Sequence, residues 1–304
     1  MIEHATRETA ATLALLRAPV RDHRRILADA LDAESALRIL HERLGGALPI
    51  GEDPVEMALA EAEGQIAAWA TSGITTLSVF DEAYPARLRS IKQMPPLIFT
   101  RGLLRDDHRA VAVVGSRSAS PDRLRVASTI ARTLAQHDVT VVSGLARGVD
   151  TAAHTGALTA GGRTVAVIAS GPDISYPPEN AELHETIAAA GLLLSAYAPG
   201  TPVAKEQFLA RNAIMSGYAA ATIVVEAEYR SGARAQARMA LEHGRPVVFP
   251  EHLLRHEWAR DYAGNKPGVY VAKDPDHLAA IVEMIIESLD LTADPIHAER
   301  LFAW

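Results

Sequence analysis

A group of polar and aromatic side chains around residue 208 has the composition of a nucleic-acid contact. The group is Lys205, Phe208, Arg211 and Asn212. Their spacing places them on one face of a helix or at its entry. An aromatic ring can stack on an exposed base while the two cations neutralise phosphates of the same strand. Phe208 taken alone would more simply be a core residue, so the prediction of binding depends on the four residues as a set.

A glycine-containing segment at 115–117 could approach a phosphate closely. It follows the apolar run V-A-V-V and reads G-S-R. Gly115 leaves room for close backbone approach, Ser116 offers a hydroxyl group, and Arg117 can hold a phosphate through two parallel hydrogen bonds. This tripeptide alone is weak evidence for a site.

A second segment, S-G-L-A-R-G-V-D at 143–150, is more specific. Gly144 and Gly148 bracket Arg147, and the segment again follows a run of β-branched residues. Both segments predict a strand whose carboxyl end leads into a helix. Backbone N–H groups in a first helical turn lack intrahelical partners and lie at the positive end of the helix dipole. Two such junctions in succession therefore predict a phosphate-binding crevice.

Several catalytic and cofactor chemistries have no matching residues in this sequence. The dinucleotide fingerprint G-x-G-x-x-G, the phosphate loop G-x-x-x-x-G-K-[ST] and the nucleophile elbow G-x-S-x-G are absent, as is cysteine. Asp150 and His154 lie one helical turn apart, but no third metal ligand is evident. The sequence therefore predicts a binding protein without catalytic residues, metal or cofactor.

The elements that position these residues alternate between strand and helix from residue 111 to 250. Short apolar runs separated by longer helical patterns, including 121–136 and 149–159, are typical of buried parallel strands. The predicted class is α/β, a Rossmann-like doubly wound, mostly parallel sheet. We expect a small helical N-terminal domain at 1–72, the Rossmann-like domain with its lead-in (73–105) at 73–250, and a C-terminal extension with a closing helix at 251–304.

Net charge argues against a broad polyelectrolyte surface. The chain has 304 residues and a net charge of −7, but residues 101–250 carry 15 Lys and Arg against 13 Asp and Glu. A slightly basic centre between acidic ends suits a localised groove for an anion, although random variation explains it equally well. The N-terminus lacks the features of a signal peptide and no apolar run approaches the length of a membrane span. We expect a cytoplasmic protein without membrane contact.

The chain resembles the DNA-processing protein A (DprA/Smf) family across roughly residues 73–250. The matching segments are Y-P-A-R-L at 84–88, P-P-L-I-F at 95–99, V-A-V-V-G-S-R at 111–117, S-G-L-A-R-G-V-D-T-A-A-H at 143–154, G-A-L-T-A-G-G-R-T-V-A-V at 156–167, Y-P-P-E-N at 176–180, K-x-x-F-x-x-R-N at 205–212, V-V-E-A at 224–227 and A-L-E-H-G-R-P-V at 240–247. The string at 143–154, together with the later R-N, is the most specific part.

The resemblance implies a protein that binds and protects single-stranded DNA and helps to load a RecA-type recombinase in recombination or transformation. It also implies a homodimer and no catalysis. The resemblance assigns to DNA binding Gly115, Ser116, Arg117, Arg147, Lys205, Phe208, Arg211 and Asn212. The predicted nucleic-acid site also includes Gly144 and Gly148, which bracket Arg147.

Departures from the family pattern leave two alternatives open. The family's F-P-x-R-N-R is F-L-A-R-N-A at 208–213, its S-G-S-L-x-T-A is S-G-A-R-A-Q-A at 231–237, and no winged-helix sequence is visible at the C-terminal end. One alternative is a Rossmann-like sensor of a nucleotide-derived small molecule. The other is a nucleotide phosphoribohydrolase, whose P-G-G-x-G-T-x-x-E motif carries a Glu for the chemistry. Gln236 stands in that region here, which disfavours hydrolysis.

Overall fold

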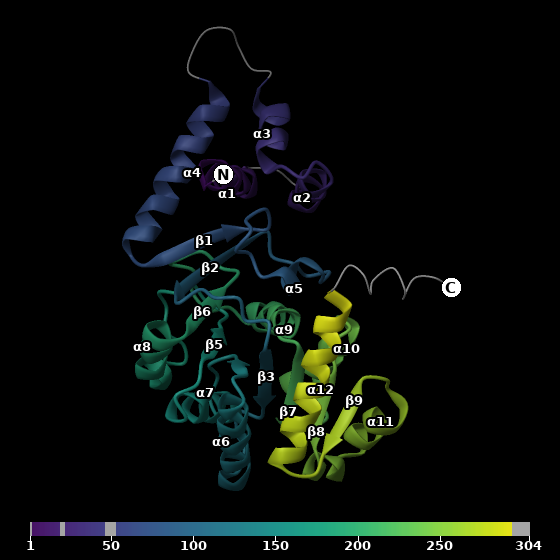
Figure 1. The fold of residues 1–304 in the computed structure, drawn as a ribbon. Helices are drawn as coiled ribbons and strands as arrows, with labels where there is room; N and C mark the ends of the chain where they lie inside the picture. Colours follow the sequence, from purple (N-terminus) through teal and green to yellow (C-terminus); the bar gives the residue numbers. More distant parts are fainter. Residues whose placement is uncertain (1, 19–21, 46–52, 294–304) are drawn as a thin grey trace, which may run out of the picture.

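In the computed structural model, which describes residues 2–18, 22–45 and 53–293, the described chain forms one nine-stranded sheet (Figure 1). Its strand order is β1-β2-β6-β5-β4-β3-β7-β8-β9. The strands are β1 (Ile74–Ser78), β2 (Leu97–Gly102), β3 (Ala110–Gly115), β4 (Thr140–Ser143), β5 (Thr164–Val167), β6 (Leu192–Ser195), β7 (Ala221–Glu226), β8 (Val247–Pro250) and β9 (Val269–Ala272).

The seven neighbouring strands β6-β5-β4-β3-β7-β8-β9 are parallel. Strand β2 pairs with β6, and β1 with β2, in antiparallel orientation. The Rossmann-like, mostly parallel α/β fold predicted from the sequence is thus confirmed. The helices are α1 (Ile2–Arg17), α2 (His23–Asp32), α3 (Ala36–Leu44), α4 (Pro54–Thr71), α5 (Ala86–Arg89), α6 (Pro121–Gln136), α7 (Val149–Thr159), α8 (Ala181–Ala190), α9 (Gln207–Tyr218), α10 (Gly232–Glu242), α11 (Glu257–Asn265) and α12 (Pro275–Ala293), with short 3₁₀ segments η1 (Pro178–Asn180) and η2 (Glu251–Arg255).

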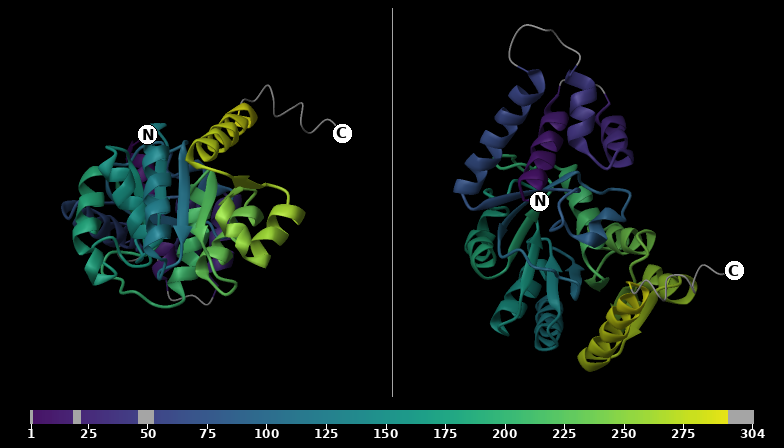
Figure 2. Two further views of the ribbon diagram at one scale, coloured as in Figure 1. Left: turned by 90° about the horizontal axis from the view of Figure 1, so that it is seen from below. Right: turned by 45° about the horizontal axis from the view of Figure 1, so that its top comes forward.

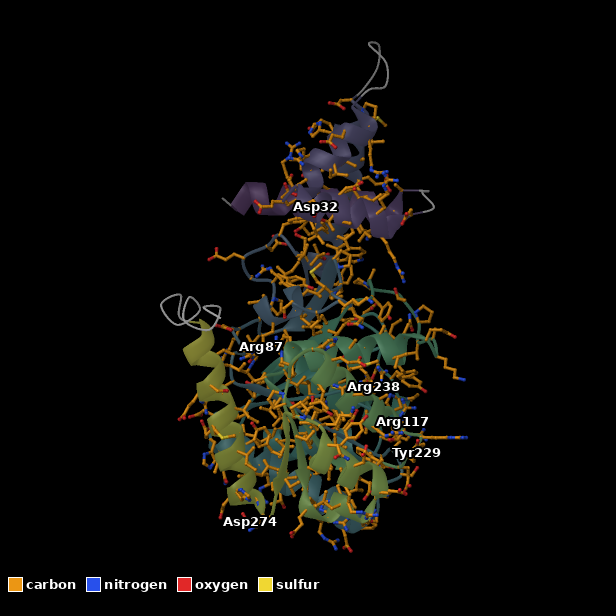
Figure 3. The ribbon with its side chains drawn as sticks, turned by 90° about the vertical axis from the view of Figure 1, so that its right-hand side faces the viewer. Asp32, Arg87, Arg117, Tyr229, Arg238 and Asp274 are labelled. Carbon is orange, nitrogen blue, oxygen red and sulfur yellow. The ribbon has the colours of Figure 1, made fainter. Side chains whose placement is uncertain are left out.

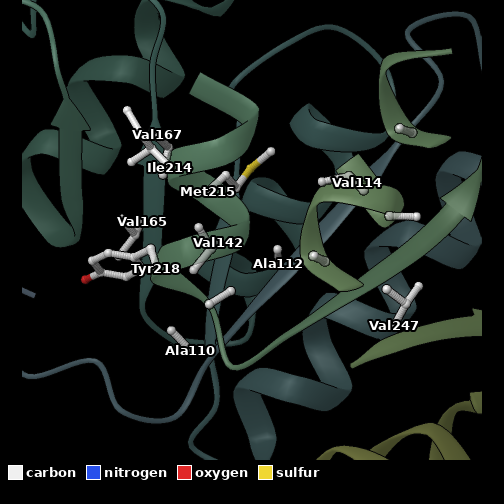
Figure 4. Packing of buried hydrophobic residues seen from close by; sticks show 14 of the residues in the cluster. Ala110, Ala112, Val114, Val142, Val165, Val167, Ile214, Met215, Tyr218 and Val247 are labelled. Carbon is white, nitrogen blue, oxygen red and sulfur yellow. The ribbon is translucent and has the colours of Figure 1, made fainter. Parts of the chain in front are cut away.

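Alternation along the strands divides the core into two layers. In β3, Ala112 and Val114 face the layer that contains residues of α9, α10 and α11, whereas Val111 and Val113 face the layer formed with α6, α7 and α12. Figure 4 shows the first layer, with Met215 and Tyr218 of α9 packed over the strands. Because the strands are covered on both faces, they read as continuous apolar runs in the sequence.

Helices α1 to α4 pack together and rest on β1 and β2 (Figures 1 and 2). Their shared core includes Trp69 of α4 and Phe99 of β2, whose rings meet edge to face at 5.2 Å. The lead-in segment thus provides the surface on which the N-terminal helices are anchored.

The segment expected as a C-terminal extension contributes to the same sheet. Strand β9 pairs with β8, and Leu278 and Ile285 of α12 are buried in the core layer of α6 and α7. The boundary predicted at residue 250 therefore lies inside the packed unit, and residues 294–304 lie outside the described chain. None of the helices in the part of the chain that the structure describes is long and apolar enough to cross a membrane.

Candidate functional site

The order in which successive strands are added to the sheet reverses between β3 and β7. These strands are parallel neighbours, but β3 leads through α6 to β4 on one side, and β7 leads through α10 to β8 on the other. Helices α6 and α10 lie on opposite faces of the sheet. Their departure in opposite directions leaves a crevice beyond the carboxyl ends of the two strands, which is where open α/β sheets bind ligands.

Two connected cavities occupy this edge of the sheet. The first lobe, of about 390 Å³, is lined by Arg117, Ser118, Gly144, Ala146, Arg147, Ile168, Ala169, Ser170, Tyr176, Pro177, Val203 and Phe208. The second lobe, of about 520 Å³, is lined by Val114 to Ser118, Ala146, Asp150, Lys205, Phe208, Leu209, Arg211, Asn212, Met215, Ser231 to Ala233 and Gln236. Because Arg117 and Phe208 line both lobes, the two lobes form one continuous groove.

Glycines allow the loops beneath the groove to touch. A Cβ on Gly115 would lie 2.6 Å from Val149, and one on Gly148 would lie 2.4 Å from the Ser116 carbonyl oxygen. Gly148 also has a φ of +79°, which other residues rarely adopt. The structure thus brings the two predicted phosphate-binding junctions into direct contact, and the glycines are required for that contact.

Phe208 lies where the two lobes meet and is surrounded by groups suited to a nucleotide. The Arg117 guanidinium carbon lies 4.8 Å from the centre of its ring, and the ring centre of Tyr176 lies 6.0 Å away. Phe208 is half-buried, whereas the Arg117 side chain is exposed. An aromatic ring and an exposed arginine that stacks on it therefore meet at one point of the groove.

Two more predicted residues line the second lobe. Lys205 is exposed just before α9, and Asn212 is half-buried one turn into that helix. The Asn212 Nδ2 atom lies 3.8 Å from the position of a Cβ on Gly232, at the start of α10. The structure therefore brings Lys205 and Asn212 to the same lobe as the loop after β7.

Arg211 lines the second lobe but, unlike Lys205 and Asn212, is almost fully buried. Only 4% of the residue is exposed, and its Nη1 donates to the carbonyl oxygens of Gly144, at 2.5 Å, and Val167, at 3.0 Å. A Cβ on Gly144 would collide with this guanidinium. Burial lowers the pKa of Arg211, partly offset by the charge of Asp150. Arg211 thus holds the ends of β4 and β5 together from beneath.

Asp150 and His154 are buried, and the charge of Arg211 acts on both. Burial raises the pKa of Asp150, partly offset by the positive charge of Arg211, and the Asp150 carboxylate accepts from the Ala146 N–H at 3.3 Å. His154 is fully buried, and burial and Arg211 lower its pKa to about 3. The Thr164 hydroxyl donates to the Val141 carbonyl oxygen, so it accepts from His154 Nδ1 at 2.6 Å. His154 is therefore neutral at pH 7 and serves the packing of α7.

The loop that carries Arg147 is fixed by residues of the Y-P-P-E-N segment. Leu145 has a φ of +56°, and Asn180 donates to its carbonyl oxygen and to the Thr151 hydroxyl, both at 2.9 Å. Arg147 is exposed and forms an ion pair with Glu179, whose pKa is lowered by hydrogen bonds, one of them from Arg147. Arg147 thus lies at the mouth of the first lobe with its charge partly balanced.

A cluster of acidic and histidine groups lies at the end of β7. Among the described residues, Glu226, Glu228 and His256 have the spacing of a metal site. However, the buried carboxylate of Glu226 accepts from Arg255 at 2.7 and 2.8 Å and lies 3.4 Å from Arg123. Two guanidinium groups already neutralise Glu226, so the cluster is better suited to an ion-pair network than to a metal ion.

The sequence does not single out Tyr176 and Gln236, which line the groove, or Tyr229, which lies in the loop before Ser231. Tyr176 follows β5 in the chain and lies beside Phe208 of α9, with 6.0 Å between the ring centres. Gln236 was considered only as a replacement for a catalytic Glu. Exposed aromatic residues next to a strand–helix junction were the available signal for both tyrosines.

Known proteins share this fold and these segments. A family model described as DNA recombination-mediator protein A matches residues 75–266. DNA processing protein DprA of Streptococcus pneumoniae is 41% identical over 183 residues, or 59% of this chain and 64% of that protein. Protein Smf of Synechocystis is 40% identical over 174 residues, or 55% of this chain and 43% of that protein. The chain thus matches less than two thirds of the length of either relative.

Two solved structures are also similar. The DprA structure from Streptococcus pneumoniae superimposes with a TM-score of 0.67 and 28% identity, covering 90% of this chain and 97% of that one. A structure of DNA processing protein A from Helicobacter pylori, described for its single-stranded DNA binding mode, gives a TM-score of 0.60 and 25% identity. It covers 71% of this chain and 96% of that one.

Proposed function

The chain belongs to the DNA recombination-mediator protein A family, and from that premise we propose that it binds single-stranded DNA in the groove formed by the two lobes. The observation that carries the proposal is the arrangement at the junction of the lobes. There the Phe208 ring is half-buried with the Arg117 guanidinium 4.8 Å from its centre. One base can stack on this ring while Arg117 and Lys205 neutralise the adjoining phosphates.

The groove favours a single strand over a duplex. Stacking on Phe208 or Tyr176 requires a base that is not already stacked between its neighbours. Strand-to-helix loops and residues of α9 and α10 line the groove, whereas readers of duplex DNA insert a helix or a β-ribbon into the major groove. The Helicobacter pylori relative, described for single-stranded DNA binding, supports the same choice.

The family also suggests partners and a cellular role. We propose that the protein acts as a homodimer that protects single strands and helps to load a RecA-type recombinase. This role would be carried out in the cytoplasm, where the DNA and the recombinase are found. Chemistry on the DNA is not part of this proposal, because Glu226 is neutralised by Arg123 and Arg255 and the nearby Gln236 is an amide.

Fluorescence anisotropy with labelled oligo-dT and a matched duplex, across a salt series, tests this function. We expect single-strand binding that weakens with salt, because cations of the groove displace counterions from phosphates. Arg117→Ala and Lys205→Ala should each weaken binding by about 1–3 kcal/mol, the range for a charge-assisted contact. Arg238→Ala is the matched control, since this exposed arginine on α10 pairs with Glu242 and lines neither lobe.

Two outcomes would contradict the proposal. Equal affinity of the Arg117 and Lys205 variants and the wild type would place the DNA elsewhere. Displacement of the oligonucleotide by AMP or ADP-ribose, or binding of these nucleotides without DNA, would indicate the sensor function instead.

A further inference from the structure

The second lobe contains a buried polar group with unmet hydrogen-bonding capacity. Gln236 of α10 is 1% exposed, and its Oε1 and Nε2 atoms have no hydrogen-bond partner among the described residues. Leaving a buried amide unpaired is costly, so such groups usually meet a ligand or water. Gln236 lines the lobe one turn below the N-terminus of this 11-residue helix, where Ser231 caps the Arg234 N–H.

An exposed aromatic residue, Tyr229, lies two residues before Ser231, which lines this lobe. Tyr229 is 62% exposed and lies two residues before the cap of α10, in the loop that follows β7. The Arg234 guanidinium carbon lies 4.0 Å from the centre of its ring, and Arg234 Nη1 donates to the Tyr229 carbonyl oxygen at 3.0 Å. One face of the ring is thus covered by a cation while most of the side chain remains accessible.

Arg234 is itself held in place by aromatic residues of α11. Its guanidinium carbon lies 5.7 Å from the ring centre of Trp258 and 5.9 Å from that of Tyr262. Trp258 is anchored in turn, because its indole N–H donates to the Ala227 carbonyl oxygen at 3.1 Å. This support orients Tyr229 before any ligand binds, which reduces the entropy lost on stacking.

The unit formed by Tyr229 and Arg234 matches the one formed by Phe208 and Arg117. Each combines an aromatic ring with a guanidinium carbon within 5 Å of its centre. Arg117 of the first unit lies in the loop after β3, and Tyr229 of the second lies in the loop after β7. The two units therefore lie on either side of the β3–β7 junction. Arg117 and Tyr229 appear on the same side of the molecule in Figure 3.

We propose that the second lobe is a second nucleotide subsite, in which Tyr229 stacks a base and Gln236 hydrogen-bonds a polar group of the same nucleotide. The inference depends on the proposed function, because it extends the same DNA strand from Phe208. A nucleotide of that strand is the occupant because the lobe is continuous with the first through Arg117 and Phe208. An amide suits this role, since it both donates and accepts hydrogen bonds.

Oligonucleotide length separates the two subsites. A short oligo-dT of about 4 nucleotides can be held at Phe208 alone, whereas one of about 12 can cover both lobes. Tyr229→Ala should weaken binding of the long oligonucleotide about 5- to 100-fold and leave the short one within about twofold of the wild type. Tyr229→Phe, which keeps the ring, should bind both lengths as the wild type does.

The results distinguish failure of this subsite from failure of the proposed function. If Tyr229→Ala binds the long oligonucleotide as tightly as wild type while Arg117→Ala does not, the second subsite is refuted and DNA binding stands. Equal weakening of both lengths by Tyr229→Ala also refutes it. If the wild type binds neither length, both proposals fail. Thermal melting of Tyr229→Ala checks that the exposed position leaves the fold intact.

Discussion

Two buried aspartates, Asp81 and Asp150, illustrate different uses of polar groups in this protein. Asp81 lies under the N-terminal helices, and one of its carboxylate oxygens accepts from the Ser78 N–H, the Ser78 hydroxyl and the Thr9 hydroxyl at 2.5 to 2.8 Å. Asp150 lies under the groove, and the Ala146 N–H donates to it at 3.3 Å. They are 7% and 6% exposed, so burial does not distinguish them.

The difference lies in how fully the surrounding polar atoms are satisfied. At Asp81 the hydrogen bonds link α1 to the strand β1, so the carboxylate fastens the helical part to the sheet. Asp150 and Gln236 both line the second lobe, where Gln236 has no partner among the described residues and burial raises the pKa of Asp150. Satisfied networks rigidify a fold, whereas unsatisfied buried groups beside a cavity indicate a ligand site.

The largest expected effect is at Asp81. Asp81→Ala should lower the free energy of unfolding by about 3 kcal/mol, because it leaves the buried Ser78 N–H without its acceptor. Urea unfolding measures this loss. DNA affinity, measured below the unfolding range, should stay at the wild-type value, since Asp81 lines neither lobe.

Thr9→Val provides a milder version of the same test. It removes one hydroxyl donor to Asp81 and should cost about 1 kcal/mol. A loss of DNA affinity in either variant, without unfolding, would show that the N-terminal network and the groove are coupled.

The second prediction concerns His154 and pH. Its pKa is about 3 when folded, against about 6.5 when unfolded, so the unfolded state binds more protons between these values. Stability therefore declines as pH falls below about 6.5, by about 2 kcal/mol at about pH 5. His154→Gln should lack this decline in urea unfolding at several pH values.

Asp150 contributes to the pH dependence with the opposite sign. Its raised pKa favours the folded state at low pH, a contribution that is lost as pH rises through the folded pKa. Asp150 is present in both proteins compared, so the difference between wild type and His154→Gln isolates the histidine. Parallel pH profiles for the two would contradict a neutral, buried His154.

A change in stability of the opposite sign is expected at Gln236. Gln236→Leu replaces an unpaired buried amide by an apolar side chain of similar size, so it should raise the free energy of unfolding by about 1 kcal/mol. The same variant should weaken binding of long oligonucleotides. A variant that is more stable but binds long oligonucleotides more weakly would show that Gln236 contacts the ligand. If Gln236 only packs in the core, its replacement would change stability alone.

Local sequence patterns were sufficient for the elements that carry the site. The helices predicted at 121–136 and 149–159 match α6 and α7. The start of α6 is encoded locally by the Ser120 cap and Pro121, and α7 begins directly after Gly148. The antiparallel addition of β1 and β2 and the entry of β9 into the sheet were not foreseen. Strand pairing depends on contacts between distant segments, which local patterns do not encode.

The site divides in the same way. The sequence by itself determined which residue types gather at the carboxyl ends of the strands, since glycines, cations and Phe208 directly follow apolar runs or share one helix. Only the tertiary structure decided how deeply each of these side chains is buried. Arg211 is buried against Gly144 and Val167, whereas Lys205, six residues earlier, is exposed. Helical spacing gives the direction of a side chain, but its burial depends on what the rest of the fold packs against it. Tyr229 likewise owes its support to Trp258 and Tyr262, about thirty residues away in the chain.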